Sequence, residues 1–240
     1  MTARDLVASE PQAPPGPEQA REPSIVARYR EMAHQFAPRP VDPVLRAFDV
    51  VGAATLLVGL LPLLAACALL VLASGGRPIL YRGARVGRGG RVFSMYKLRT
   101  LRAGAHERLA PYYGEELTRR TEREVTLVGR GLRALKLDEL PQLWNVLRGD
   151  MSMVGPRPIR PTFFEELCLQ IPAYWQRLVV RPGITGFAQL RLTREMTWAE
   201  KLAHDFEWIA DRSLGLYVSM LVETAWTLAT RPPRGPVGRI

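Results

Sequence analysis

One stretch of the chain, Val50–Ala73, runs for 24 residues without a formal charge. As a helix rising about 1.5 Å per residue it would reach roughly 36 Å, more than the hydrocarbon core of a bilayer at about 30 Å. A buried helix of a soluble protein is the alternative, but such helices usually keep a polar face. The stretch therefore predicts a segment that is embedded in a membrane.

Pro62 stands in the middle of this stretch and predicts a kink, because its ring crowds the preceding turn and it has no N–H to donate. Both flanks are basic, with Arg39 and Arg46 before the stretch and Arg77 after it. Positive flanks favour the cytoplasmic side of a membrane. A bent helix that enters and leaves on one face would satisfy both flanks, and the residues alone leave this re-entrant form and a spanning helix open.

The whole chain of 240 residues carries a formal net charge of +10, which predicts anionic partners: nucleic acid, phosphate-bearing substrates or an anionic membrane face. No helix-turn-helix, zinc-finger or aromatic RNA-binding signature is present, so nucleic acid is not an expected partner. The two cysteines make no disulfide framework, and the three histidines, His34, His106 and His204, are scattered. Carboxylates, lysines and arginines must therefore carry any chemistry.

We expect four segments along the chain. Residues 1–43 hold eight of the 20 prolines and predict a disordered N-terminal extension. Residues 44–76 form the membrane-embedded helix–break–helix, residues 77–230 a mixed domain, and residues 231–240 a flexible basic tail. The expected fold class is α/β, mainly helical with few short strands.

Within the mixed domain, Pro78–Tyr81 and Val92–Tyr96 predict short strands around a Gly/Arg loop, Gly83–Gly90. Helices are expected over Leu140–Leu147, over Thr162–Val180 with an interruption near Pro172, after the capping-box spacing at Thr197, and over Leu214–Leu228. The apolar surface of the last helix is typical of either a core or a bilayer interface.

Three segments have residue types suited to phosphate chemistry. The Gly/Arg loop leads to Lys97 and Arg99, and arginine forks onto phosphate oxygens, although a basic loop beside a membrane also suits lipid headgroups. Asp138 and Glu139 precede a helix whose N-terminus favours anions, but an Asp cap with a solvated Glu is the plainer interpretation.

The third segment comprises two stiff loops that present Arg157 between prolines and Arg181 before a proline. A structural loop with a solvated arginine is the alternative there. Taken together, the segments suggest phosphoryl transfer at a membrane surface. Carboxylates can bind Mg²⁺ or attack phosphorus, and cations can neutralise a diphosphate.

The stretch Leu137–Pro158, LDELPQLWNVLRGDMSMVGPRP, resembles the signature of the bacterial sugar transferases, the monotopic phosphoglycosyl transferases that act on polyprenol phosphate. The resemblance extends to RVGRGGRVFSMYKLRT before it and to RPGITGFAQ after it. It covers roughly residues 44–230 and leaves the proline-rich extension outside.

The resemblance implies transfer of a sugar 1-phosphate from a UDP-sugar to undecaprenyl phosphate, by way of a phosphosugar intermediate on Asp138 and with release of UMP. Glu139 would hold Mg²⁺ together with Asp138, or position the acceptor. The expected phosphate and nucleotide contacts are Lys97, Arg99, Arg133, Arg157 and Arg181.

The resemblance also implies a re-entrant membrane helix broken at Pro62, with amphipathic interfacial helices around a small catalytic domain on the cytoplasmic face of a bacterial inner membrane. Leu61 stands where the family often has serine before this proline. The anionic phospholipid bilayer is then a partner, while the sugar, the downstream glycosyltransferases and self-association stay open. A non-catalytic scaffold that binds anionic or polyprenyl-phosphate lipid is the alternative function.

Overall fold

The structure is a computed structural model that describes residues 39–109, 114–191 and 196–230. The predicted basic tail lies outside these ranges, as does the predicted N-terminal extension up to residue 38. The first described helix, α2, begins at Val41, inside the segment that was expected to be an extension. Mainly helical with few short strands, the architecture is the expected α/β class.

The uncharged stretch forms two helices, α2 (Val41–Gly59) and α3 (Leu61–Gly75), whose axes differ by 62°. The break lies at Leu60, and Pro62 occupies the first turn of α3, where its missing N–H costs no helical hydrogen bond. The expected kink is thus present. Within the described residues no single helix is long and apolar enough to cross a bilayer, but this bent pair passes that test together.

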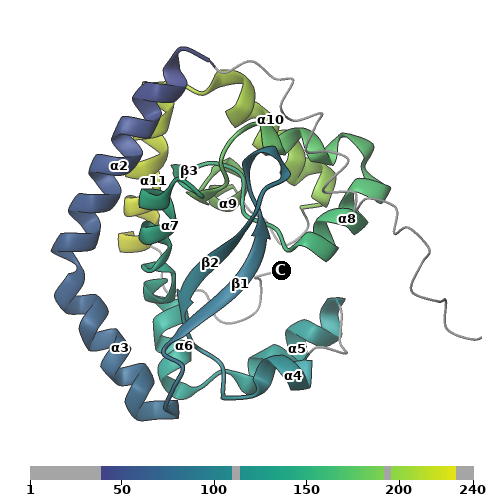
Figure 1. Cartoon of the computed structure of the whole chain (residues 1–240). Coiled ribbons are helices and arrows are strands. Elements are labelled where there is room, and N and C mark those ends of the chain that lie inside the picture. The colour runs from purple at the N-terminus through teal and green to yellow at the C-terminus, as the bar shows by residue number, and fades with distance from the viewer. Residues whose placement is uncertain (1–38, 110–113, 192–195, 231–240) are drawn as a thin grey trace, which may run out of the picture.

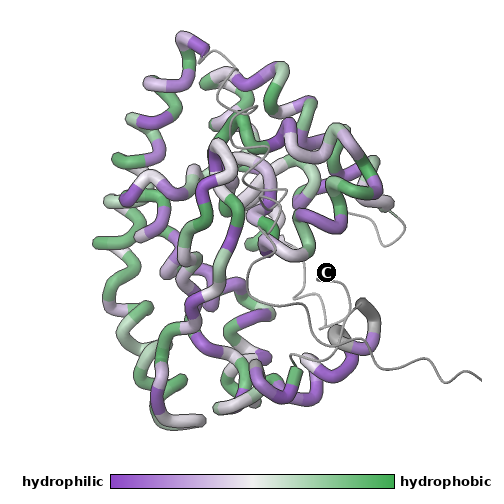
Figure 2. The backbone as a smooth tube through the Cα atoms, turned by 45° about the vertical axis from the view of Figure 1, so that its right-hand side comes forward, coloured by the Kyte–Doolittle hydropathy of each residue, from purple (hydrophilic) through white to green (hydrophobic). Residues whose placement is uncertain are grey.

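The helix pair lies along one side of the molecule, with α11 (Leu214–Thr230) beside α2 (Figure 1). Only a narrow stripe of the pair is buried: Leu45, Asp49 and Ala53 of α2, and Cys67 and Val71 of α3. Many of the remaining apolar side chains are exposed. Hydrophobic residues occur along much of this helix pair (Figure 2). The large exposed apolar residues of the pair are Val44, Phe48, Val50, Val51, Leu56, Val58, Leu61, Leu63, Leu69 and Leu70.

A buried hydrogen-bond network around Asp49 joins α2 to the rest of the chain. One oxygen of the Asp49 carboxylate accepts from the Ser152 hydroxyl at 2.8 Å, from the Met153 N–H at 2.8 Å and from the Tyr217 hydroxyl at 2.9 Å. These donors come from β3 (Ser152–Val154) and α11. A buried carboxylate is tolerated only where it is bonded in this way, so the network fixes how α2 sits on the domain.

The centre of the domain is the antiparallel hairpin of β1 (Leu80–Val86) and β2 (Val92–Leu98), in which Tyr81 lies opposite Lys97. Both strands are longer than the sequence indicated. The prediction that Gly83–Gly90 is a loop was wrong for Gly83–Val86, which pair within the strand. The turn itself needs only Arg88–Gly90, where Gly89 and Gly90 take positive φ angles of 62° and 71°.

Further helices surround the hairpin (Figure 1). α6 (Leu127–Ala134) and α7 (Gln142–Arg148) pack between it and the helix pair, and α7 ends as expected at Gly149, with φ 86°. Two polar helices, α4 (Ala105–Leu109) and α5 (Gly114–Glu124), lie on the side of the hairpin away from the helix pair. A two-stranded parallel sheet pairs β3 with β4 (Gly183–Thr185), which is followed by the short α9 (Phe187–Leu190).

The C-terminal half confirms three expectations of helix placement. α8 (Pro161–Gln170) stops before Pro172 and continues as a 3-10 segment, Pro172–Val179. α10 (Trp198–Asp211) begins with the Thr197–Glu200 capping box. α11 lies over the predicted stretch, with Tyr217 and Met220 buried in the core and other apolar side chains, such as Trp226 at 69%, exposed. Its placement at a bilayer interface stays a prediction.

Two glycines of α6 allow a matched test of how tightly this helix packs. A Cβ on Gly129 would lie 2.2 Å from the Thr100 carbonyl oxygen, whereas nothing lies within 4 Å of a Cβ on Gly131. We expect Gly129→Ala to lower stability by about 1–3 kcal/mol through overpacking. Gly131→Ala should raise it by about 0.5–1 kcal/mol through helix propensity. Thermal unfolding of both variants in detergent measures the difference, and equal shifts would contradict this packing.

Candidate active site

The two adjacent carboxylates lie on a short 3-10 turn, Leu137–Glu139, between α6 and α7. Asp138 is only 5% exposed. Neither residue caps α7, since Pro141 holds the cap position and no side chain bonds there. The interpretation as an Asp cap with a solvated Glu was therefore wrong. Lys136 enters the turn with φ 55°, a left-handed conformation that is uncommon outside glycine and that marks a constrained backbone.

Lys97 of β2 forms an ion pair with Glu139, with 2.8 Å between Nζ and Oε1. The two side chains are 18% and 13% exposed, so solvent screens the pair only in part. The structure thus brings together three of the predicted site residues, Asp138, Glu139 and Lys97, from segments about 40 positions apart in sequence. A cation beside the carboxylates is what an anionic substrate would require.

Asn145 fixes α7 against the strand that carries Lys97. Its fully buried side chain accepts from the Tyr96 N–H at 3.0 Å and donates to the Ser94 carbonyl at 2.7 Å. A side-chain amide can bond both an N–H and a carbonyl of a strand edge, because it carries one acceptor and two donors. The carboxylate turn at the start of α7 is thereby held in register with β2. Sequence reasoning did not single out Asn145.

Arg99 and Arg133 both bond to nearby parts of the fold. Arg99 is 8% exposed and donates to the carbonyls of Gly75, Gly76 and Arg77, at 2.6, 2.7 and 3.1 Å. It therefore fastens β2 to the end of α3. Arg133, in the last turn of α6, donates from Nε to the Thr100 hydroxyl at 2.8 Å. Their role as phosphate contacts stays a prediction.

Arg181 lies at the other end of α7 from the carboxylates. Its Nε donates to the Gly149 carbonyl at 3.0 Å, and Arg46 donates to the Val146 and Leu147 carbonyls beside it. Cations are favoured at a helix C-terminus, where carbonyls lack helical partners. Burial, with Arg46 and Arg88 nearby, lowers the pKa of the Arg181 guanidinium from its ordinary value. The structure does not bring Arg181 to the carboxylate pair.

A buried ion pair supports the loop that presents Arg157. Arg177 lies 2.7 Å from the carboxylate of Asp205, and the two side chains are 5% and 6% exposed. The same guanidinium donates to the Tyr174 hydroxyl at 2.7 Å and to the Arg157 carbonyl at 2.9 Å. Sequence reasoning missed Arg177. Through its bond to the Arg157 carbonyl, the pair holds the backbone of Arg157 in place.

The carboxylates suit a magnesium ion by chemistry. Mg²⁺ is usually held by one or two carboxylates, and substrate phosphates and water complete its coordination. In the part of the chain that the structure describes, no group of three or more Asp, Glu, His or Cys side chains could hold a metal by itself. Two adjacent carboxylates match the donor set of an ion whose coordination a diphosphate completes, and magnesium binding by Asp138 and Glu139 stays a prediction.

Comparison with protein families matches residues 41–231 to the family described as bacterial sugar transferase. The chain belongs to this family. It is 40% identical over 195 residues to the UDP-glucose:undecaprenyl-phosphate glucose-1-phosphate transferase of Caulobacter vibrioides, covering 79% of this chain and 71% of the relative. It is 37% identical over 189 residues to the exopolysaccharide production protein ExoY of Rhizobium meliloti, with 74% and 82% covered.

A third relative is longer. The UDP-N-acetylgalactosamine-undecaprenyl-phosphate N-acetylgalactosaminephosphotransferase of Aeromonas hydrophila is 35% identical over 197 residues, which are 80% of this chain and 45% of the relative. The chain therefore spans less than half the length of this protein. The names of the relatives specify different sugars, so similarity alone does not select one.

The Arg177–Asp205 pair gives a stability prediction. Arg177→Met leaves Asp205 buried without its partner, and we expect a loss of about 3–5 kcal/mol in the free energy of unfolding. Adding Asp205→Asn to Arg177→Met removes the buried charge and should recover part of the loss. Thermal unfolding of the single and double variants checks this. A single variant as stable as the wild type would contradict a supporting role for the pair.

Proposed function

We propose that the chain transfers a sugar 1-phosphate from a UDP-sugar to undecaprenyl phosphate, giving undecaprenyl-diphosphate-sugar and UMP. The observation that carries the proposal is the pair of carboxylates on a constrained turn, one buried and the other held 2.8 Å from Lys97. Family membership supports the general reaction, and the names of relatives describe sugar phosphate transfer to undecaprenyl phosphate. This step would begin the assembly of an exopolysaccharide or related glycan.

In the proposed reaction, a carboxylate oxygen of Asp138 attacks the phosphorus that bears the sugar. A P–O bond forms to Asp138, the P–O bond to the uridylyl group breaks, and UMP leaves with that electron pair. The phosphate oxygen of undecaprenyl phosphate then attacks the same phosphorus and releases the Asp138 carboxylate. Two displacements divide one transfer into two steps, so the two substrates need not be bound together.

The surrounding side chains would position the phosphorus and offset its charge. Lys97 supplies a cation next to Glu139, and the Arg177–Asp205 pair holds the backbone of Arg157. Asp138 and Glu139 would hold Mg²⁺, which neutralises diphosphate charge when it is bound. Burial of Asp138 keeps water from the nucleophile, which favours transfer over hydrolysis.

The membrane arrangement is part of the same proposal. The exposed apolar faces of α2, α3 and α11 would lie in the cytoplasmic leaflet of a bacterial inner membrane, with anionic phospholipid around the arginines. The break at Leu60 and Pro62 would return α3 to the side on which α2 begins. An acceptor with a polyprenyl chain would then meet the catalytic domain from the bilayer.

Asp138→Asn should reduce UMP release by on the order of 10³-fold or more, because an amide oxygen cannot replace the carboxylate as nucleophile. The assay offers a panel of UDP-sugars to the full chain with Mg²⁺ and undecaprenyl phosphate. Asp211→Asn, on the exposed end of α10, is the matched control and should keep wild-type turnover.

Mass spectrometry adds a direct readout of the intermediate. Wild-type protein given donor without acceptor should gain a phosphosugar on the peptide that contains Asp138. An intact Asp138→Asn variant with wild-type turnover would contradict the mechanism. Lipid binding without UMP release from any donor would instead favour a non-catalytic scaffold.

Single cysteines at the two ends of the helix pair test the topology. Asp49, which flanks the uncharged stretch, is buried and bonded, so Pro40, which precedes α2, and Arg77, both exposed, are better positions for the label. We expect Pro40→Cys and Arg77→Cys to react with an impermeant maleimide from the cytoplasmic side only. Native Cys67 and Cys168 are buried, which keeps the background low. Labelling of one position only from outside would contradict re-entry.

A further inference from the structure

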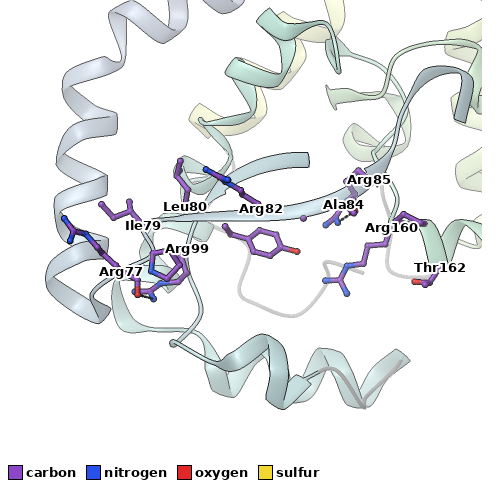
Figure 3. Close-up of a pocket in the computed structure, with 13 residues that line it drawn as sticks. Arg77, Ile79, Leu80, Arg82, Ala84, Arg85, Arg99, Arg160 and Thr162 are labelled. Atoms are coloured by element: carbon purple, nitrogen blue, oxygen red, sulfur yellow. Dashed lines mark hydrogen bonds between the residues drawn. The ribbon is translucent and has the colours of Figure 1, made fainter. Parts of the chain in front are cut away.

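A cavity of about 1000 Å³ opens along β1, the strand that pairs with the Lys97 strand β2 (Figure 3). Among the described residues that line it, five are arginines and none is acidic. The arginines are Arg77, Arg82, Arg85, Arg99 and Arg160. Such a concentration of one charge in a concave site raises the local concentration of anions. The cavity lining includes Gly83–Arg85, the start of the Gly/Arg segment whose residue types suit either phosphate or lipid headgroups.

The strand register connects this cavity to the catalytic pair. Tyr81 lies directly opposite Lys97, and partners in an antiparallel ladder project from the same face of the sheet. Gly83 and Arg85 follow Tyr81 at alternate positions, so they share that face too. The face that carries Lys97 toward Glu139 is thus continuous with the cavity wall.

Gly83 allows Tyr81 and Arg85 to meet. A Cβ on Gly83 would lie 2.5 Å from the Tyr81 hydroxyl, closer than real Cβ atoms come to other heavy atoms, and 3.0 Å from Nη1 of Arg85. The Tyr81 ring therefore lies across the glycine, and its hydroxyl bonds the Arg85 guanidinium. Arg85 also donates from Nη1 to the Ala84 carbonyl at 2.7 Å, so its guanidinium lies close to its own strand.

Arg85 has the electrostatics of an anion-binding residue. Its pKa is lowered by burial, and the like charges of Arg160 and Arg157 lower it further, while Tyr81 opposes them. Among the described residues no carboxylate lies within 4 Å of Arg85, Arg157 or Arg160. An arginine cluster without a counter-ion is destabilised by its own repulsion, and a bound phosphate relieves that repulsion.

The cavity has two cationic ends (Figure 3). Arg77 and Arg99 lie at the end of α3, the helix with the apolar surface, while Arg85 and Arg160 lie at the opposite end. A phosphate on a membrane-bound lipid would reach the α3 end first. A water-soluble nucleotide can enter the distant end, where α8 also begins and contributes the partial positive charge of its N-terminus.

Resting on the proposed function, we propose that the Tyr81–Gly83–Arg85 face, with Arg160, is the subsite for the nucleoside diphosphate of the donor. Arg85 binds the phosphate that leaves with the nucleoside, and the sugar-bearing phosphate extends along the strand to Lys97 and Asp138. Tyr81 is a positioning residue that holds Arg85.

The test measures UDP affinity by calorimetry with Mg²⁺, and KM for donor and acceptor in the UMP-release assay. Arg85→Met should weaken UDP binding and raise donor KM by roughly tenfold or more, through loss of charge-assisted hydrogen bonds, and leave acceptor KM unchanged. Gly83→Ala, which keeps every charge, should produce the same pattern by displacing Tyr81 and Arg85. Arg91→Met removes one charge from an exposed position of the same hairpin and should change neither KM.

Each outcome of these measurements supports or contradicts the proposed subsite. Unchanged UDP affinity and donor KM in Arg85→Met, with wild-type turnover intact, would overturn the subsite alone. A rise in acceptor KM instead would assign the arginines to the lipid phosphate and also overturn it. If wild-type protein released no UMP from any UDP-sugar, the proposed function itself would fail. A matched melting temperature for Gly83→Ala and wild type separates displacement of the site from unfolding.

Discussion

The candidate active site depends on how a seven-residue helix is held in place. α7 is too short to be stable alone, because helix nucleation is costly and isolated helices of this length are marginal. Its own Asn145 joins it to the edge of β2, and two arginines from other segments bind its C-terminal end. Arg46 of α2 reaches its final carbonyls, and Arg181 binds the carbonyl of Gly149. Together with the apolar packing of Leu143 and Val146, these bonds hold the carboxylate turn at its N-terminus in position.

This arrangement explains why arginines that resemble one another in sequence do different work. Arg99 and Arg181 both stand near glycine- or proline-containing loops in the sequence. In the structure, both donate to backbone carbonyls that a helix end leaves without partners. Arg85 instead donates to the carbonyl of its neighbour Ala84, bonds the Tyr81 hydroxyl and lines the cavity with Arg160. These contacts stay within β1, which separates Arg85 from the two arginines that join a helix end to another segment.

Much of the fold follows from local sequence patterns. The kink at Pro62, the interruption at Pro172, the capping box at Thr197 and the helix end at Gly149 all depend on backbone chemistry that acts within one turn. The site was predicted less completely, because its contacts join distant segments. The carboxylates and Lys97 stood out by residue type, and the resemblance assigned their roles. Asn145 and Arg177 act through partners far away in the sequence, which residue spacing does not reveal. Tyr81, Gly83 and Arg85 alternate as strand residues do, and interpreting this segment as a loop concealed their common face.

The buried carboxylate of Asp49 bears on how separable the helix pair of α2 and α3 is from the rest of the domain. Three donors from β3 and α11 converge on it from outside the helix pair. Replacing the pair with an unrelated apolar anchor would leave those donors buried without an acceptor, and each would cost free energy. The helix pair is therefore not interchangeable with another apolar segment. A replacement would need a hydrogen-bond acceptor at the position of the Asp49 carboxylate.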